Sequence, residues 1–174
     1  MRSNALPSPL ACLALTATLL VGSSAGCKSS QEKAGQRAAT MQNGAQVQLV
    51  EGGLLMTTDA GTVALGENAK IPDDFPKTVP LYPGAKVNMA ARSAGDKGKP
   101  AWSLSLESGD EQPKVVAFYA TNMTASAGAF KKGSDLALGD TQMTVWQGAQ
   151  FDVTLMISAG ADNQTAISMT VAGK

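Results

Sequence analysis

The sequence predicts an α+β fold in which one helix packs on one face of an antiparallel β-sheet. Two blocks of the chain, residues 85–107 and 131–172, alternate apolar with polar residues, which is the period of half-buried strands. Between these blocks, the apolar residues of 115–123 follow a helical spacing. One helix cannot cover both faces of such a sheet, so we expect one dry face and one wet face. The expected core is residues 85–174, in the order β-β-α-β-β-β.

Residues 1–26 have the layout of an export signal. Arg2 supplies a positive charge, and the apolar residues 10–22 follow, a stretch shorter than the about 20 residues that span a bilayer. Small residues then lead to Cys27. This layout is similar to the lipobox of bacterial lipoproteins, whose cysteine receives a diacylglyceryl group before cleavage and becomes the first residue. Ser24 stands where leucine is usual, and a conventional signal peptide with a chance cysteine is the alternative.

Three segments are expected between the signal peptide and the core. Residues 27–45 are small, polar and charged, which predicts a lipidated, flexible tether. Residues 46–66 alternate like short strands around glycine-containing turns, which predicts a small β-meander. Residues 67–84 are rich in proline, and prolines there follow large apolar residues, so we expect an extended strap docked on the core. The alternative for Pro80–Pro83 is a P-x-x-P polyproline ligand.

The elements of the core are expected in a definite order. Strands at 85–91 and 102–107 are joined by a turn at 95–100. The helix is expected to start at a capping box, Ser108 to Glu111, and to end at Gly128. Strands follow at 131–138, where the pattern is weak, and at 141–147, 151–158 and 165–172. The side chains expected on the wet face of the last two strands are Asp152, Thr154, Ser168 and Thr170.

Two motifs carry a resemblance. Residues 71–87 read IPDDFPKTVPLYPGAKV, and residues 115–123 of the predicted helix read VVAFYATNM. These motifs resemble a widespread group of uncharacterised bacterial lipoproteins, which pair a P-x-D-F-P-x-x-V-P-x-Y-P-G-A segment with a Phe-Tyr helix that often ends in Gly-Trp. Phe118 and Tyr119 match that helix, whereas residues 128–130 replace Gly-Trp with Gly-Ala-Phe. The resemblance, over roughly residues 54–130, implies an exported small domain of unassigned activity.

Composition excludes several kinds of chemistry. The chain has no histidine, the commonest general base and metal ligand. Cys12 lies in the predicted signal and Cys27 is expected to carry lipid, so no thiol is left for a disulfide or a metal. Removal of Arg2 reduces the 14 basic residues to 13, against 14 acidic ones, a balance too even for nucleic-acid binding. Asp73 and Asp74 are expected in a solvated turn, with a calcium or acid–base site as the alternative. We expect no catalytic residue, metal or cofactor.

The sequence therefore predicts a lipid-anchored bacterial envelope lipoprotein that is not an enzyme and binds or assembles with another envelope protein. Trp146, expected on the outer face of its strand, is the candidate contact residue. The first alternative is a periplasmic receptor that holds a small apolar ligand between helix and sheet, lined by Trp102, Phe118 and Met123. The second alternative is a hydrolase that uses carboxylates alone.

The lipid on Cys27 is expected to attach the exported protein to the cell membrane. Lys28 follows the cysteine, where aspartate would retain lipoproteins in the inner membrane of enteric bacteria. This difference favours the periplasmic face of the outer membrane in a cell that has one.

Lipidation can be tested by labelling expressing cells with radioactive palmitate. The wild-type protein should be labelled, and Cys27→Ser should abolish the label because the thiol that receives the diacylglyceryl group is gone. Cys12→Ser should keep the label, since that cysteine leaves with the signal peptide. An unlabelled wild-type protein, processed at another residue, would contradict the prediction.

Overall fold

The computed structural model divides the chain into two compact units, residues 1–34 and residues 35–174. The structure describes residues 38–40, 45–67, 69–95 and 98–174, all of which belong to the second unit. The predicted signal peptide, Cys27 and the predicted tether up to residue 37 lie outside the described residues, as do residues 41–44.

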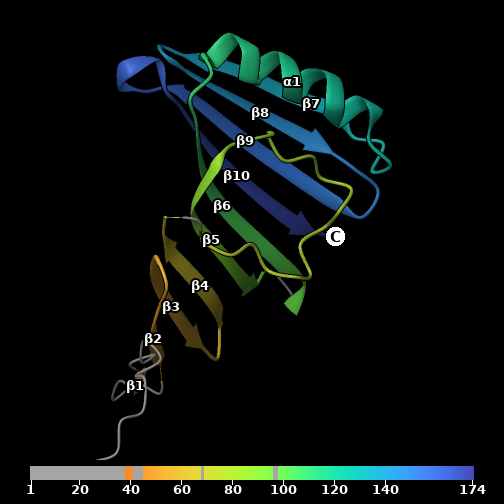
Figure 1. The fold of residues 1–174 in the computed structure, drawn as a ribbon. Coiled ribbons are helices and arrows are strands. Elements are labelled where there is room, and N and C mark those ends of the chain that lie inside the picture. The colour runs from red at the N-terminus through yellow and green to blue at the C-terminus, as the bar shows by residue number, and fades with distance from the viewer. Residues whose placement is uncertain (1–37, 41–44, 68, 96–97) are drawn as a thin grey trace, which may run out of the picture. The chain divides into compact units, whose positions relative to one another are not determined.

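The described residues form one ten-stranded antiparallel sheet in the order β1-β2-β3-β4-β5-β6-β10-β9-β8-β7 (Figure 1). Its first four strands are β1 (Ala38–Thr40), β2 (Gln46–Val50), β3 (Gly53–Thr58) and β4 (Gly61–Gly66). The other six are β5 (Lys86–Ala94), β6 (Pro100–Ser108), β7 (Lys131–Leu138), β8 (Thr141–Gln147), β9 (Phe151–Ala159) and β10 (Thr165–Gly173). An α-helix, α1 (Gln112–Ala125), follows β6, and a 3₁₀ turn at Ala161–Asn163 precedes β10.

The expected α+β class with a β-β-α-β-β-β core is wrong, because the fold is β-rich, with a single short α-helix in its described part. The weakly patterned segment 131–138 forms a full strand, β7, at the edge of the sheet, so residues 85–174 contribute six strands. The N-terminal strands extend the same sheet because β4 pairs with β5 across the intervening strap. Part of the segment predicted to be a flexible tether also forms a strand, β1, paired with β2. The alternation of residues within one segment does not show which distant segment that strand pairs with.

Helix α1 and the strap together cover one face of the sheet. The helix packs against β7 and β9 and buries one stripe of side chains, Val115, Tyr119 and Met123. The strap buries Phe75, Val79 and Tyr82 in the same core. The two covers meet where the ring of Tyr82 packs edge-on against Phe118, with ring centroids 4.9 Å apart. Among the described residues, the core therefore lies between the sheet and one covering layer, and this layer consists of α1 and the extended strap.

Hydrogen bonds attach the end of the strap to the start of the helix. The Tyr82 hydroxyl donates to Oδ2 of Asp110 at 2.8 Å, and Lys114 Nζ lies 2.6 Å from Oδ1 of the same carboxylate. The helix begins after Glu111, which makes no side-chain capping bond, so the predicted capping box is wrong. Ser108 Oγ instead accepts a hydrogen bond from the Asp110 backbone nitrogen at 3.1 Å, because the chain turns before the helix begins.

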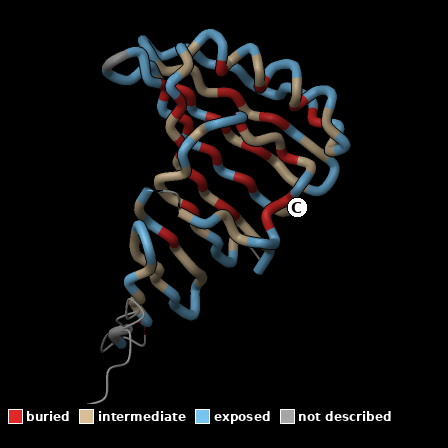
Figure 2. The backbone as a smooth tube through the Cα atoms, viewed as in Figure 1, coloured by how far each residue is buried: buried red, intermediate tan, exposed pale blue. Residues whose placement is uncertain are grey.

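The two faces of the sheet differ as the alternation predicts. On the covered face, one cross-strand row runs through Leu55, Ala64, Ala90, Leu104, Met169 and Leu155. On the other face, Ser168 and Thr170 are exposed and Asp152 and Thr154 are half-buried, so the predicted wet face is confirmed. Figure 2 shows the buried residues gathered along the strands that α1 and the strap cover, and rare in β2 to β4.

Phe75 offers a test of the strap as part of the core. Its ring is 8% exposed and lies edge-on to Trp102, with centroids 6.3 Å apart. Phe75→Ala should lower the free energy of unfolding by about 3–5 kcal/mol, because it leaves a cavity beneath the strap. Lys77→Ala, an exposed position on the same strap, should change it by less than about 0.5 kcal/mol. Urea titration measures both, and equal small effects would show that the strap is not part of the cooperative core.

Candidate functional site

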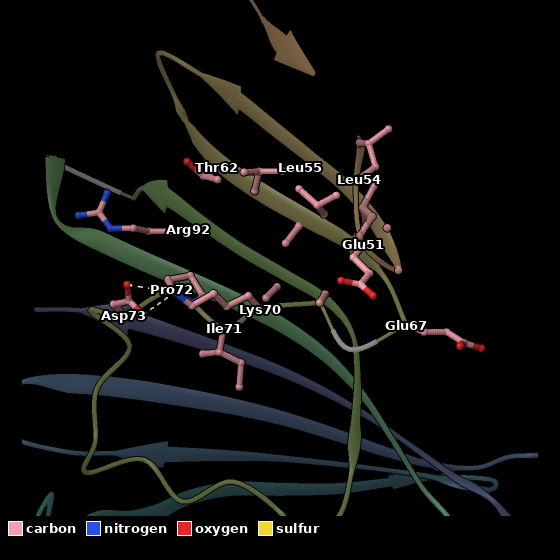
Figure 3. Close-up of a pocket in the computed structure, with 17 residues that line it drawn as sticks. Glu51, Leu54, Leu55, Thr62, Glu67, Lys70, Ile71, Pro72, Asp73 and Arg92 are labelled. Carbon is pink, nitrogen blue, oxygen red and sulfur yellow. Dashed lines mark hydrogen bonds and ion pairs between the residues drawn. The ribbon is translucent and has the colours of Figure 1, made fainter. Parts of the chain in front are cut away.

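A cleft of about 520 Å³ lies between the N-terminal strands and the beginning of the strap. Strands β3, β4 and β5 form one wall, and residues 69–73 of the strap form the other. Figure 3 shows Leu55 and Thr62 on the strand side and Ile71 and Pro72 on the strap side, with the Ile71 side chain directed away from the strands. The cleft is thus on the covered face of the sheet, at the end that α1 does not reach.

Small side chains on two neighbouring strands create the hollow. Ala64 and Ala90 are paired partners at the centre of the cross-strand row, between Leu55 and Leu104. Where that row continues beneath α1 and the strap, its members are large. Two methyl groups in place of two larger side chains leave unfilled space next to the strap. Ala64 is 8% exposed and Ala90 1% exposed, so the floor of the cleft is apolar and formed by the sheet itself.

Backbone hydrogen bonds hold the strap wall of the cleft. The amide of Ala69 donates to the carbonyl oxygen of Gly66 at 3.2 Å and to that of Val87 at 2.8 Å. These bonds tie the first residues of the strap to the end of β4 and the start of β5. Because both walls are anchored to the same strands, the cleft is a preformed feature of the backbone.

Two ion pairs occupy one end of the cleft. Arg92 Nε pairs with Oδ2 of Asp74, whose Oδ1 accepts a hydrogen bond from Trp102 Nε1 at 3.2 Å. Burial works to raise the pKa of the Asp74 carboxyl, but the hydrogen bonds from Arg92 and Trp102 outweigh it and hold that pKa below its ordinary value of 3.8. Lys70 Nζ lies 3.0 Å from Oδ1 of Asp73, and both side chains are largely exposed.

The adjacent Asp73 and Asp74 are therefore not a convergent pair of carboxylates. Asp73 pairs with a lysine three residues earlier in the strap, whereas Asp74 binds an arginine of β5 and a tryptophan of β6. In the part of the chain that the structure describes, no group of three or more histidine, cysteine, aspartate or glutamate side chains is placed to hold a metal ion. Asp74 has a structural role, because its bonds to Arg92 and Trp102 attach the strap to β5 and β6.

Two glutamates mark the opposite end of the cleft. Glu51 is in the turn between β2 and β3, and Glu67 follows β4 (Figure 3). Glycines bring these segments together, because a Cβ atom on Gly53 would lie 2.0 Å from the Leu65 carbonyl oxygen. Gly66 has a φ of +123°, which favours glycine. Neither glutamate has an ion pair within the described residues, so this end of the cleft carries uncompensated negative charge.

Trp146 is placed differently from the prediction. It is 4% exposed and belongs to the core, so its expected outward orientation and its role as a contact surface are wrong. Strand β8 carries apolar residues on both faces, Val145 on one and Trp146 on the other, and alternation alone does not choose between them. Pairing with Val153 of β9 puts Trp146 on the covered face, since a one-residue shift of phase exchanges the two faces.

The other predicted site residues do not gather into a cavity. Trp102 and Met123 are 3% and 0% exposed and lie in the close-packed core, with Phe118 packed against it. This packing counts against a ligand held between helix and sheet at these residues. Cys27 lies outside the described residues. Of the candidate site residues considered from the sequence, Asp73 borders the cleft, and Asp74 pairs with Arg92, which borders it.

Comparison with known proteins identifies no relative. No protein-family model, no curated protein and no solved structure matches the chain. The resemblance to bacterial lipoproteins therefore stays a prediction from the motifs alone. Among the described residues, no helix is both long and apolar enough to cross a membrane.

The Asp74 interactions predict a specific dependence of stability on pH. The pKa of Asp74 is lowered in the folded state, so its stabilising effect is present above the ordinary pKa of 3.8 and is lost as pH falls through the lower folded value. Asp74→Asn should lower the free energy of unfolding by about 1 kcal/mol at pH 7, a value limited by the half-exposed ion pair. The difference from wild type should shrink below about pH 4.

Urea titrations at pH 7, 5 and 3 measure this difference. Asp73→Asn is the matched control, because its carboxylate pairs only with an exposed lysine, and it should change stability by less than about 0.5 kcal/mol. A constant gap between Asp74→Asn and wild type from pH 7 to pH 3 would contradict the assigned role of the Asp74 charge.

Proposed function

We propose that this protein is a non-enzymatic binding module, held at the bacterial cell envelope by a lipid on Cys27. Its binding site is the cleft between strands β3 to β5 and the start of the strap. The observation that carries this proposal is the cleft itself, which is preformed, mostly apolar on its floor and bordered by a few charged side chains. Its volume of about 520 Å³ falls within the range of small-molecule sites in proteins, about 300–1,000 Å³.

The lining of the cleft indicates the chemistry of the ligand. Leu55, Ala64, Ala90 and Ile71 offer an apolar surface that suits a hydrocarbon or aromatic group. At one end the cations Lys70 and Arg92 are already paired with aspartates, whereas the glutamates at the other end have no described ion pair. A ligand with an apolar body and a neutral or positively charged polar group therefore fits better than an anion.

This proposal keeps the idea of a receptor for a small apolar ligand but moves the site. The predicted location beneath the helix is filled by close-packed side chains. The cleft arises instead where the N-terminal strands extend the sheet beyond the cover provided by α1. Binding of another envelope protein remains compatible with the same surface, since an apolar side chain of a partner has the chemistry of the proposed ligand.

The proposal can be tested with a neutral fluorescent probe, N-phenyl-1-naphthylamine, and a chain that begins at residue 28. That chain keeps the whole compact unit Gly35–Lys174, which contains the core. Wild type should bind the probe, and Ala64→Leu should weaken the binding by at least about tenfold, because the added side chain fills the cleft. Fluorescence titration measures the affinity.

The matched control is Ala166→Leu, an exposed alanine on the wet face of β10. It should leave probe affinity within about twofold of wild type. The thermal midpoint of each variant verifies that it folds. Equal binding by wild type and Ala64→Leu would exclude the cleft as the binding site.

A further inference from the structure

The wet face of the sheet is apolar over the N-terminal strands. One cross-strand row there consists of Leu49, Leu54, Leu65 and Met89, and Met56 and Val63 are paired in the next row. We call these six residues the apolar patch. Leu49 is 52% exposed and Leu65 is 40% exposed, while the other four are half-buried. The strands β2 to β5 thus carry apolar side chains on both faces.

The same rows become polar where they cross the middle of the sheet. Met89 is paired with Ser105 of β6, which is paired in turn with Ser168 of β10. Helix α1 and the buried residues of the strap lie on the opposite face and cannot cover the patch. Contiguous exposed apolar surface of this kind is rare in proteins and marks a site of contact with another apolar surface.

We propose that the apolar patch lies against the lipid bilayer to which Cys27 anchors the protein, an inference that rests on the proposed lipid anchor. The link from Cys27 to Ala38 spans 11 residue steps. Whatever conformation it adopts, it reaches at most about 38 Å. At its end, β1 pairs directly with β2, which carries Leu49. The proposed anchor is therefore connected to the sheet through this edge.

The chemistry of the patch also favours lipid. None of its six side chains is charged or hydroxylated, so contact with acyl chains and the apolar part of the headgroup region requires no loss of hydration by a charge. An interfacial surface of this kind is weak by itself. A nearby lipid anchor makes it effective, because two attachments to the same bilayer add to each other.

Contact through the patch would also orient the binding site. Along β3 and β4, Met56 and Val63 of the patch alternate with Leu55 and Ala64 of the cleft, whereas Leu54 and Leu65 belong to the patch and also border the cleft. Successive side chains of a strand point to opposite faces. A sheet that rests on the bilayer through its patch therefore directs Leu55 and Ala64 away from the membrane, while Leu54 and Leu65 place one border of the cleft at the membrane contact.

Co-sedimentation with vesicles of palmitoyl-oleoyl phosphatidylcholine tests the proposal. The chain that begins at residue 28 is used, so that binding does not depend on the lipid. Wild type should partition onto the vesicles, and the double variant Leu49→Thr/Leu65→Thr should bind about tenfold less. Threonine keeps the strand preference of these positions, and the urea midpoint of the variant verifies its fold.

Met156→Thr is the matched control. Met156 is 42% exposed on the wet face of β9, at the other side of the polar middle strands. It should leave vesicle binding within about twofold of wild type. Absence of binding by wild type, unchanged binding by the double variant, or an equal loss in Met156→Thr would each overturn the proposal.

Sedimentation velocity without vesicles shows whether the patch contacts the lipid bilayer or the patch of a second copy of this protein. A monomer that binds vesicles supports the proposal, whereas a dimer dissolved by Leu49→Thr/Leu65→Thr would assign the patch to self-association and overturn it. Failure here is distinct from failure of the proposed function, because palmitate labelling and probe binding to the cleft are measured independently.

Discussion

The structure depends on how one face of a ten-stranded sheet is shielded from water. The described chain has a single α-helix for this purpose, which covers only part of that face. Helix α1 covers strands at the β7 side, and the strap must cover the rest with Phe75, Val79 and Tyr82. Extended chain cannot bond to itself as a helix does, so it needs fixed attachments. Tyr82 bonded to Asp110 and Asp74 bonded to Trp102 supply them, and Thr165 of β10 also donates to the Asp110 carbonyl oxygen at 2.6 Å.

The same constraint accounts for the cleft. The strap enters the sheet at Ala69 and buries its first large aromatic ring only at Phe75, so its beginning lies over β4 and β5 without filling the space above them. Ala64 and Ala90 add no side-chain volume there. The cleft is thus the place where the cover is thinnest, and its walls are still held by backbone bonds and ion pairs. A hollow maintained in this way suits a binding site, because little reorganisation accompanies occupation.

The two faces of the N-terminal strands are proposed to contact different partners. Their covered face borders the cleft, and their wet face carries the apolar patch, with the change to serine and threonine at β6 and β10. This arrangement places the proposed membrane contact and the proposed ligand site on the same strands, where Leu54 and Leu65 border both. A protein attached by a short N-terminal link would benefit from that arrangement, since one contact orients the other.

The sequence by itself determined the local elements: the strand periods, the helix around residues 115–123, the proline-rich extended strap and the wet face of β9 and β10. It also determined the candidate export and lipidation signals. Only the tertiary structure decided that β4 pairs with β5, that Trp146 is buried and that Ala64 lies beside Ala90 at a cleft. The physical reason is that alternation specifies which residues share a face. Which face is covered, and by what, depends on register and on contacts between segments far apart in the chain.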